Sequence, residues 1–184
     1  MKGIIFNLLE EVIRQEYGED TWDSLLEAAG LDGIYTSLGS YGDEELIKLV
    51  DAASTALNTP PDQIIRWFGR NSIPLLAERY PQFFEAHATT RSFILTLNDI
   101  IHPEVRKIYP GAQVPVFEFD TSDERVVEMS YESPRKLCAL AEGMIEGAAA
   151  HYGEEVTLAH PHCMLRGDER CWLTIAFQKS ALAA

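Results

Sequence analysis

The chain has 184 residues, of which 46% are apolar and 24% are charged, enough for one domain of generous size or two small ones that share a face. This apolar content excludes a disordered protein, and three cysteines are too few for a disulfide-stapled mini-protein. The net charge of −14, with 15 Lys and Arg against 29 Asp and Glu, argues against a nucleic-acid partner.

Apolar residues recur at helical spacing through most of the first 110 positions. The pattern predicts amphipathic helices at about 2–17, 20–30, 43–57, 60 onward and 90–109. Gly18 and Gly30 end the first two, because glycine readily adopts the conformations that stop a helix. We expect Pro74 to bend or interrupt the fourth helix.

After Pro110 the pattern changes to β-rich runs joined by polar turns. The predicted strands cover about 114–120, 125–131, 156–165 and 170–177. An apolar helix is predicted at 134–151, between the two hairpins. The sequence therefore predicts an α+β fold, in which an N-terminal helical subdomain packs on a C-terminal antiparallel sheet that carries its own helix.

No apolar run approaches the roughly 20 residues that a membrane-spanning helix requires. The apolar start of the chain is interrupted by Asn7 and Glu10, which a signal peptide does not tolerate. We therefore expect a cytoplasmic protein with no membrane partner, whose thiols stay reduced. An odd number of reduced cysteines favours metal ligation, redox sensing or burial.

A first candidate site is the segment in which Tyr131, Ser133 and Arg135 alternate with other residues. Pro134 predicts that a helix begins here, and the free N–H groups of a first helical turn attract anions. The Arg135 guanidinium is suited to a carboxylate, so the three side chains predict a clamp for a ligand carboxylate. The alternative is a helix N-cap beside an exposed arginine.

A second candidate is His102, which lies beside the apolar stripe of its predicted helix. Pro103 disfavours α-helical geometry at His102, so we expect a kink or break there. An imidazole at a kink beside an apolar wall can present a nitrogen atom to a metal. The alternative is an ordinary half-exposed helical histidine.

The third candidate combines thiols and imidazoles, from Cys138, His160, His162, Cys163 and Cys171. Cys163 and Cys171 are symmetric about Gly167, so on a hairpin they would be cross-strand neighbours. With an upstream imidazole and Cys138 they could complete a tetrahedral zinc site. The alternatives are three buried, inert thiols or, under oxidation, a disulfide between Cys163 and Cys171.

Together these features resemble the haem nitric oxide/oxygen-binding (H-NOX) family, which includes bacterial stand-alone gas sensors and the haem domain of soluble guanylate cyclase. The resemblance covers nearly the whole chain and is carried by residues 1–5, 18–22, His102, Tyr131, Ser133 and Arg135. It implies one domain over 1–184, with a distal helical subdomain at 1–60, a proximal subdomain with the sheet at 61–184, and a frayed end at 180–184.

The resemblance also assigns roles around a haem that would lie between the two subdomains. It implies that His102 is the proximal ligand of a b-type haem iron. The propionates would be bound by Tyr131, Ser133 and Arg135, and Pro115 would press on the macrocycle and distort it. The distal wall would be formed by Ile5, Leu9, Leu76, Leu140 and Met144.

The distal wall indicates which gas would bind. Family members that hold O₂ use a tyrosine hydroxyl at the position of Leu140, and Leu9 and Leu76 supply no donor either. The only polar residue expected nearby is Ser72. Bound O₂ would lack a hydrogen bond worth about 1 kcal/mol or more, so we expect the ferrous haem to bind NO and CO and to exclude O₂.

The resemblance implies sensing rather than catalysis, and the chain shows no acid–base or nucleophile arrangement typical of an enzyme. NO would weaken or break the bond between iron and His102, and the helical half would then rotate against the sheet half. No effector segment follows residue 180, so we expect the output to pass to a separate histidine kinase or diguanylate cyclase, the partners that the family implies.

A subset of the family carries a zinc site in the C-terminal hairpin. The resemblance implies that the ligands here are Cys138, His160, Cys163 and Cys171, with His162 as a competitor for the imidazole position. Thiol oxidation could then be coupled to signalling. The alternative function is a zinc/thiol redox switch, in which cysteine oxidation is the main signal and haem is absent or incidental.

Overall fold

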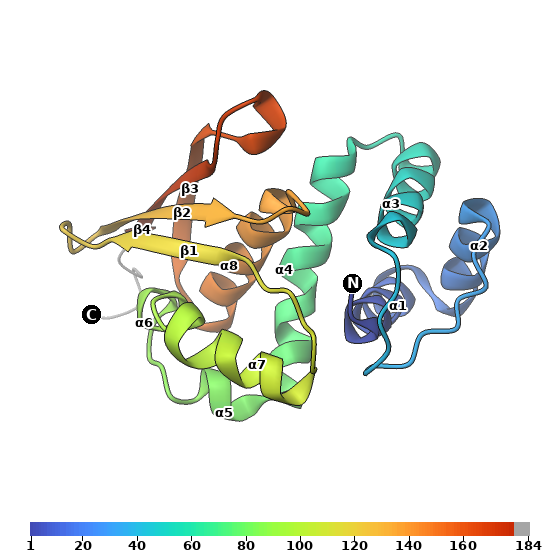
Figure 1. Cartoon of the computed structure of the whole chain (residues 1–184), viewed down its shortest axis with the longest axis horizontal. Coiled ribbons are helices and arrows are strands. Elements are labelled where there is room, and N and C mark those ends of the chain that lie inside the picture. Colours follow the sequence, from blue (N-terminus) through green and yellow to red (C-terminus); the bar gives the residue numbers. More distant parts are fainter. Residues whose placement is uncertain (179–184) are drawn as a thin grey trace.

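The computed structural model describes residues 1–178. It combines many helices with a four-stranded antiparallel sheet (Figure 1), which confirms the predicted α+β class. The end predicted to fray, at 180–184, lies outside the described residues.

The helices follow the predicted order closely in the first half of the chain. They are α1 (Gly3–Tyr17), α2 (Glu19–Ala29), α3 (Asp43–Leu57), α4 (Pro61–Arg79), α5 (Pro81–Phe84), α6 (Thr90–Ile94), α7 (His102–Ile108) and α8 (Cys138–His151). A π-helical turn, η1 (Leu97–Ile101), precedes α7, and a 3₁₀ turn, η2 (Met164–Arg166), follows the third strand. Among residues 1–178, no helix combines the length and the apolar character needed to cross a membrane.

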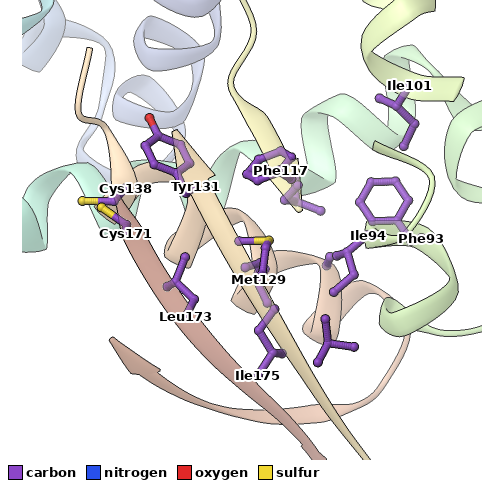
Figure 2. Packing of buried hydrophobic residues seen from close by; sticks show 14 of the residues in the cluster. Phe93, Ile94, Ile101, Phe117, Met129, Tyr131, Cys138, Cys171, Leu173 and Ile175 are labelled. Atoms are coloured by element: carbon purple, nitrogen blue, oxygen red, sulfur yellow. The ribbon is translucent and has the colours of Figure 1, made fainter. Parts of the chain in front are cut away.

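The sheet consists of β1 (Val116–Asp120), β2 (Val126–Glu132), β3 (Glu155–His162) and β4 (Cys171–Gln178), in the order β1-β2-β4-β3. Alternate residues of β2 and β4 point to one face, as the period of a strand requires. On this face Val127, Met129, Leu173 and Ile175 are at most 1% exposed and belong to one core (Figure 2). The predicted hairpins are therefore confirmed, and the buried face of the sheet is apolar.

Two hydrophobic cores meet at α4, which lies between the N-terminal helices and the sheet (Figure 1). One core buries α1, α2 and α3, together with Ile64 and Phe68 of α4. The other core buries Ile73 of α4 against α8 and the sheet. Because α4 contributes to both cores, it is the structural link between the two halves.

The predicted interruption at Pro74 is wrong, because α4 continues through Pro74 to Arg79, while the bend that we also expected there stays a prediction. A proline inside a helix removes one N–H donor from the hydrogen-bond ladder, and its ring crowds the carbonyl four residues earlier. Ile73 and Leu75, on either side of it, are 3% and 5% exposed. Ile73 packs in the core with α8 and the sheet, and Leu75 packs in the core of the N-terminal helices. Packing on both sides keeps this helix continuous through the proline.

The predicted single helix at 90–109 is divided into α6, η1 and α7. The expected irregularity is a π turn that ends just before His102, whose N–H bonds to the Leu97 carbonyl five residues earlier, but His102 itself keeps the α-helical dihedral angles (φ −64°, ψ −39°) that Pro103 was expected to disfavour. The ring of Pro103 clashes with the carbonyl four residues before it in an α-helix, and the wider π turn relieves this conflict. The Asn98 side chain then fixes η1 to β1 through both backbone groups of Phe117, at 2.6 and 3.3 Å.

Candidate functional site

A cavity of about 300 Å³ lies between the N-terminal helices, α7, α8 and the sheet. Most of its lining is aliphatic or aromatic, which suits a flat apolar ligand. Residues predicted to contact the haem line this cavity: Ile5, Leu76, Pro115, Tyr131, Ser133, Leu140 and Met144. His102 and Arg135 also line it, so residues far apart in the sequence, such as Ile5 and Met144, meet at one cavity.

Two expected distal residues do not line the cavity. Leu9 is packed in the N-terminal core at 4% exposure, and Leu8 takes its place in the lining. Successive residues of a helix differ by about 100° in direction, so a shift of one position moves a side chain to another face. Ser72 is fully buried, and its hydroxyl donates to the carbonyl oxygen of Gly69 at 2.8 Å, so it is not a donor to the cavity.

His102 is the first residue of α7 and lines the cavity. Its ring stacks on Phe117, with 5.5 Å between the ring centroids. Burial, assisted by the positive charge of Arg106, lowers the pKa of His102 to about 4. The imidazole is therefore neutral at pH 7, which is the form that binds a metal ion.

The predicted helix start at Ser133 is wrong. Helix α8 begins only at Cys138, because Lys136 adopts a positive φ of 53°, which no helix interior accommodates. Residues 133–137 form a turn closed by a hydrogen bond from the Lys136 N–H to the Ser133 carbonyl. The first helical turn therefore lies beyond the clamp, and attraction of an anion depends on the side chains.

The three clamp residues all line the cavity, and the Arg135 backbone N–H donates to the Ser133 hydroxyl at 3.3 Å. The Tyr131 hydroxyl accepts from the Leu137 backbone N–H at 3.0 Å, which fixes the turn on the end of β2. The Arg135 guanidinium binds Asp43 through Nε at 2.8 Å and the Gln113 carbonyl through Nη1 at 2.8 Å. Within residues 1–178, Nη2 of Arg135 donates no hydrogen bond, so this nitrogen can serve a carboxylate.

Asp43 joins the clamp to the start of the chain. Its carboxylate also accepts from the Met1 ammonium at 2.6 Å. Burial opposes its ionisation, but the hydrogen bonds from Met1 and Arg135 outweigh burial and lower the pKa of Asp43. Since Asp43 begins α3 and Arg135 follows β2, this ion pair connects the helical half to the sheet half at the cavity.

The residues present fit a haem. A neutral imidazole enters an apolar cavity, and a guanidinium with one uncommitted nitrogen lies at its polar end. These are the groups that bind the iron and the propionates of a b-type haem. The clamp and the imidazole come from different elements, so their spacing depends on the packing of α7 against β1 and β2.

A pair of tyrosines in the lining was missed by the sequence reasoning. The hydroxyls of Tyr80 and Tyr109 hydrogen-bond to each other, and both side chains line the cavity. Tyr109 ends α7, about 10 Å along the helix from His102. No pattern in the sequence relates Tyr80 to Tyr109, since the pair depends on where the ends of α4 and α7 meet.

The thiols and one imidazole form a second cluster, on the other side of α8. The Sγ atom of Cys163 lies 3.7 Å from that of Cys138 and 4.0 Å from that of Cys171, and Figure 2 shows Cys138 and Cys171 side by side. One ligand atom from each of Cys138, His160, Cys163 and Cys171 lies within 4.8 Å of the others. This spacing suits four ligands around one ion and is too long for a disulfide.

His160 rather than His162 completes the cluster. The His162 side chain is 61% exposed and lies 3.5 Å from Asp168. The Nε2 atom of His160 is buried and has no hydrogen-bond partner within residues 1–178. Burial and the neighbouring thiols raise the pKa of the Cys138 thiol, and binding of a metal ion by this thiol would release its proton.

Comparisons with known proteins agree with this geometry. A family model described as "Haem-NO-binding" matches residues 2–160. The chain belongs to this family. Its members bind haem and sense gaseous ligands such as NO, and they signal to partners without being catalytic by themselves.

Solved structures of other haem-NO-binding proteins share the whole fold. An H-NOX protein from S. oneidensis in the Fe(II)NO ligation state has a TM-score of 0.91 and 34% identity, covering 97% of this chain and 100% of that one. A mutant H-NOX protein from S. oneidensis in the Fe(II) ligation state has a TM-score of 0.92 and 33% identity over 100% of both chains.

A eukaryotic relative matches over a shorter stretch. Soluble guanylate cyclase gcy-32 of Caenorhabditis elegans is 31% identical over 71 residues, which is 38% of this chain. The matched stretch is only 10% of the cyclase.

Proposed function

We propose that this protein is a haem-based NO sensor whose ferrous haem binds NO and CO and excludes O₂. The observation that carries the proposal is the neutral His102 imidazole in an apolar cavity whose predicted distal residues supply no hydroxyl. The Fe(II)NO state of the S. oneidensis relative supports NO as the ligand. The partner would be a histidine kinase or a diguanylate cyclase in the same compartment, which we propose to be the cytoplasm.

In this proposal the protein holds the haem at three places. His102 binds the iron, the Tyr131, Ser133 and Arg135 group binds the propionates, and Pro115 presses on the macrocycle. When bound, the haem would supply a ferrous iron that can take NO as a ligand, and His102 would be the residue that holds this iron.

The protein's response follows from how His102 is attached. His102 begins α7 directly after the π turn, and among residues 1–178 the side-chain hydrogen bonds between that turn and β1 are those of Asn98 with Phe117. A released imidazole would let α7 move relative to β1. The Asp43–Arg135 ion pair would pass this movement to α3, a two-state change of the kind that a ligand can bias.

Exclusion of O₂ gives a direct test of the distal wall. In air, the reduced wild-type protein is expected to keep its unliganded absorption spectrum, whereas Leu140→Tyr should form an O₂ complex because a hydroxyl would then face the ligand. Leu140→Phe is the matched control, since it adds the ring without the donor. A stable O₂ complex of the wild type would contradict the proposal, and Tyr80→Phe would then show whether Tyr80 is the donor.

We further propose that Cys138, His160, Cys163 and Cys171 bind one Zn²⁺. The observation that favours a metal is the buried, unpartnered Nε2 atom of His160 facing three thiols. A zinc/thiol redox switch without a functional haem is the competing function, and it predicts a colourless protein without a Soret band.

Metal analysis tests the zinc site. We expect about one zinc per purified chain, and Cys171→Ser should remove most of it because one thiolate of four ligands is lost. His162→Ala is the control, since its exposed ring lies outside the cluster and its zinc content should match the wild type. Zinc-free wild-type protein would show that the cysteines are merely buried thiols.

A further inference from the structure

One carboxylate lies directly behind the proposed zinc ligand His160. The Glu142 Oε1 atom is 2.5 Å from His160 Nδ1, while the other ring nitrogen, Nε2, is buried without a partner. Glu142 is one helical turn after Cys138 on α8, so the carboxylate and the thiol lie on the same face of the helix. A hydrogen bond at Nδ1 places the ring proton there and leaves the lone pair on Nε2.

Glu142 is itself held from the opposite side. Its second oxygen, Oε2, accepts from Arg66 Nη1 of α4 at 2.7 Å, and Arg66 Nη2 donates to Glu146 at 2.6 Å. The Glu142 side chain is only 11% exposed. A buried carboxylate without partners would be costly, and here both oxygens are engaged, one by a cation and one by the imidazole.

This arrangement matches a carboxylate–histidine pair behind a metal. Such a pair fixes the tautomer and orientation of the ligating ring and raises its basicity. We infer that Glu142 is a positioning residue for the metal site, and that Arg66 anchors it to α4. The inference deepens the proposed zinc site and rests on it.

Contacts from His160 through Glu142 to Arg66 connect the proposed metal site to α4. Helix α8 carries Cys138 and Glu142 toward the cluster and Leu140 and Met144 toward the cavity. Arg66 spans the close contact between α4 and α8, the two helices that contribute Leu76, Leu140 and Met144 to the cavity wall. Glu142 therefore connects the proposed metal site to the contact between these two helices.

Zinc affinity tests the inference on the full-length, haem-loaded protein. The metal is removed, and Zn²⁺ is titrated back in competition with a chromophoric chelator. Glu142→Ala should weaken zinc binding about 10- to 100-fold, the usual effect of losing such a partner. Glu142→Gln should give a smaller loss, because its side-chain oxygen still accepts from Nδ1. Glu146→Ala is the matched control on the same helix, because it leaves the bond to His160 intact, and its zinc affinity should stay within about twofold of wild type.

Co²⁺ substitution reports the ligand set separately from stability. A displaced His160 should change the d–d absorption bands in Glu142→Ala and keep the thiolate-to-cobalt bands, and Glu142→Gln should restore the wild-type bands. An unchanged Soret band confirms that each variant is folded, and Glu142→Gln replaces Glu142→Ala if the latter fails to fold. Wild-type affinity and cobalt bands in both Glu142 variants would overturn this inference alone. A wild-type protein that binds neither ion would overturn the zinc site and this inference together.

Discussion

Replacing His102 by alanine is expected to remove the proximal ligand and to weaken haem binding at least about tenfold, equivalent to 1.4 kcal/mol. The wall around His102 is apolar, and no other histidine lines the cavity within the described residues. The reduced variant should therefore lose the absorption spectrum of histidine-ligated ferrous haem. Added imidazole should restore that spectrum, because the substitution leaves a space of matching shape beside Phe117.

Haem content per chain and the spectrum of the reduced protein check this result. His151→Ala is a suitable control, because this exposed histidine at the end of α8 does not itself line the cavity and meets Phe84 only edge-on. A His102→Ala protein with wild-type haem content and an unchanged spectrum would show that another side chain binds the iron, and the proposed sensor mechanism would fail.

Gly143→Ala is expected to destabilise the fold by about 3 kcal/mol or more. A Cβ atom at Gly143 would lie 1.9 Å from the carbonyl oxygen of Arg66 and 2.9 Å from the backbone nitrogen of Arg70. Backbone atoms cannot rotate away from such a clash, so α4 and α8 would have to separate. In an exposed helix the same substitution would stabilise by about 1 kcal/mol, which makes the sign of the effect diagnostic.

Denaturant unfolding of both proteins measures this difference, and the melting temperature should fall by roughly 6–12 °C for a chain of this length. Ala150→Ser, at an exposed position of the same helix, also adds one atom and should change the free energy of unfolding by less than about 0.5 kcal/mol. A variant as stable as the wild type would mean that the helices are less closely packed than described. Because the two helices also contribute to the cavity wall, we expect weakened haem retention in Gly143→Ala.

The sequence by itself determined most of the elements and the residue types of both candidate sites. Helices α1, α2 and α3 and the two hairpins follow from apolar periodicity and from glycines that stop helices, which are local properties. The resemblance selected His102 and Arg135 from a chain in which each alone could be an ordinary surface residue. In the structure, His102 and Arg135 both line the cavity. The four proposed zinc ligands lie together in a separate cluster.

Tertiary structure decided what depends on contacts between distant elements. Helix α4 passes through Pro74 because packing on both sides outweighs one lost hydrogen bond. Leu8 rather than Leu9 faces the cavity because packing of α1 in the N-terminal core sets the orientation of this helix about its own axis. The start of α8 at Cys138 depends on the backbone of Lys136, which no periodicity reveals. Separating His160 from its competitor His162 required knowing that His160 lies with the three cysteines, whereas the His162 side chain is exposed. Spacing along a chain fixes which face a side chain shares with its neighbours, whereas its partners from other elements are fixed only when those elements pack.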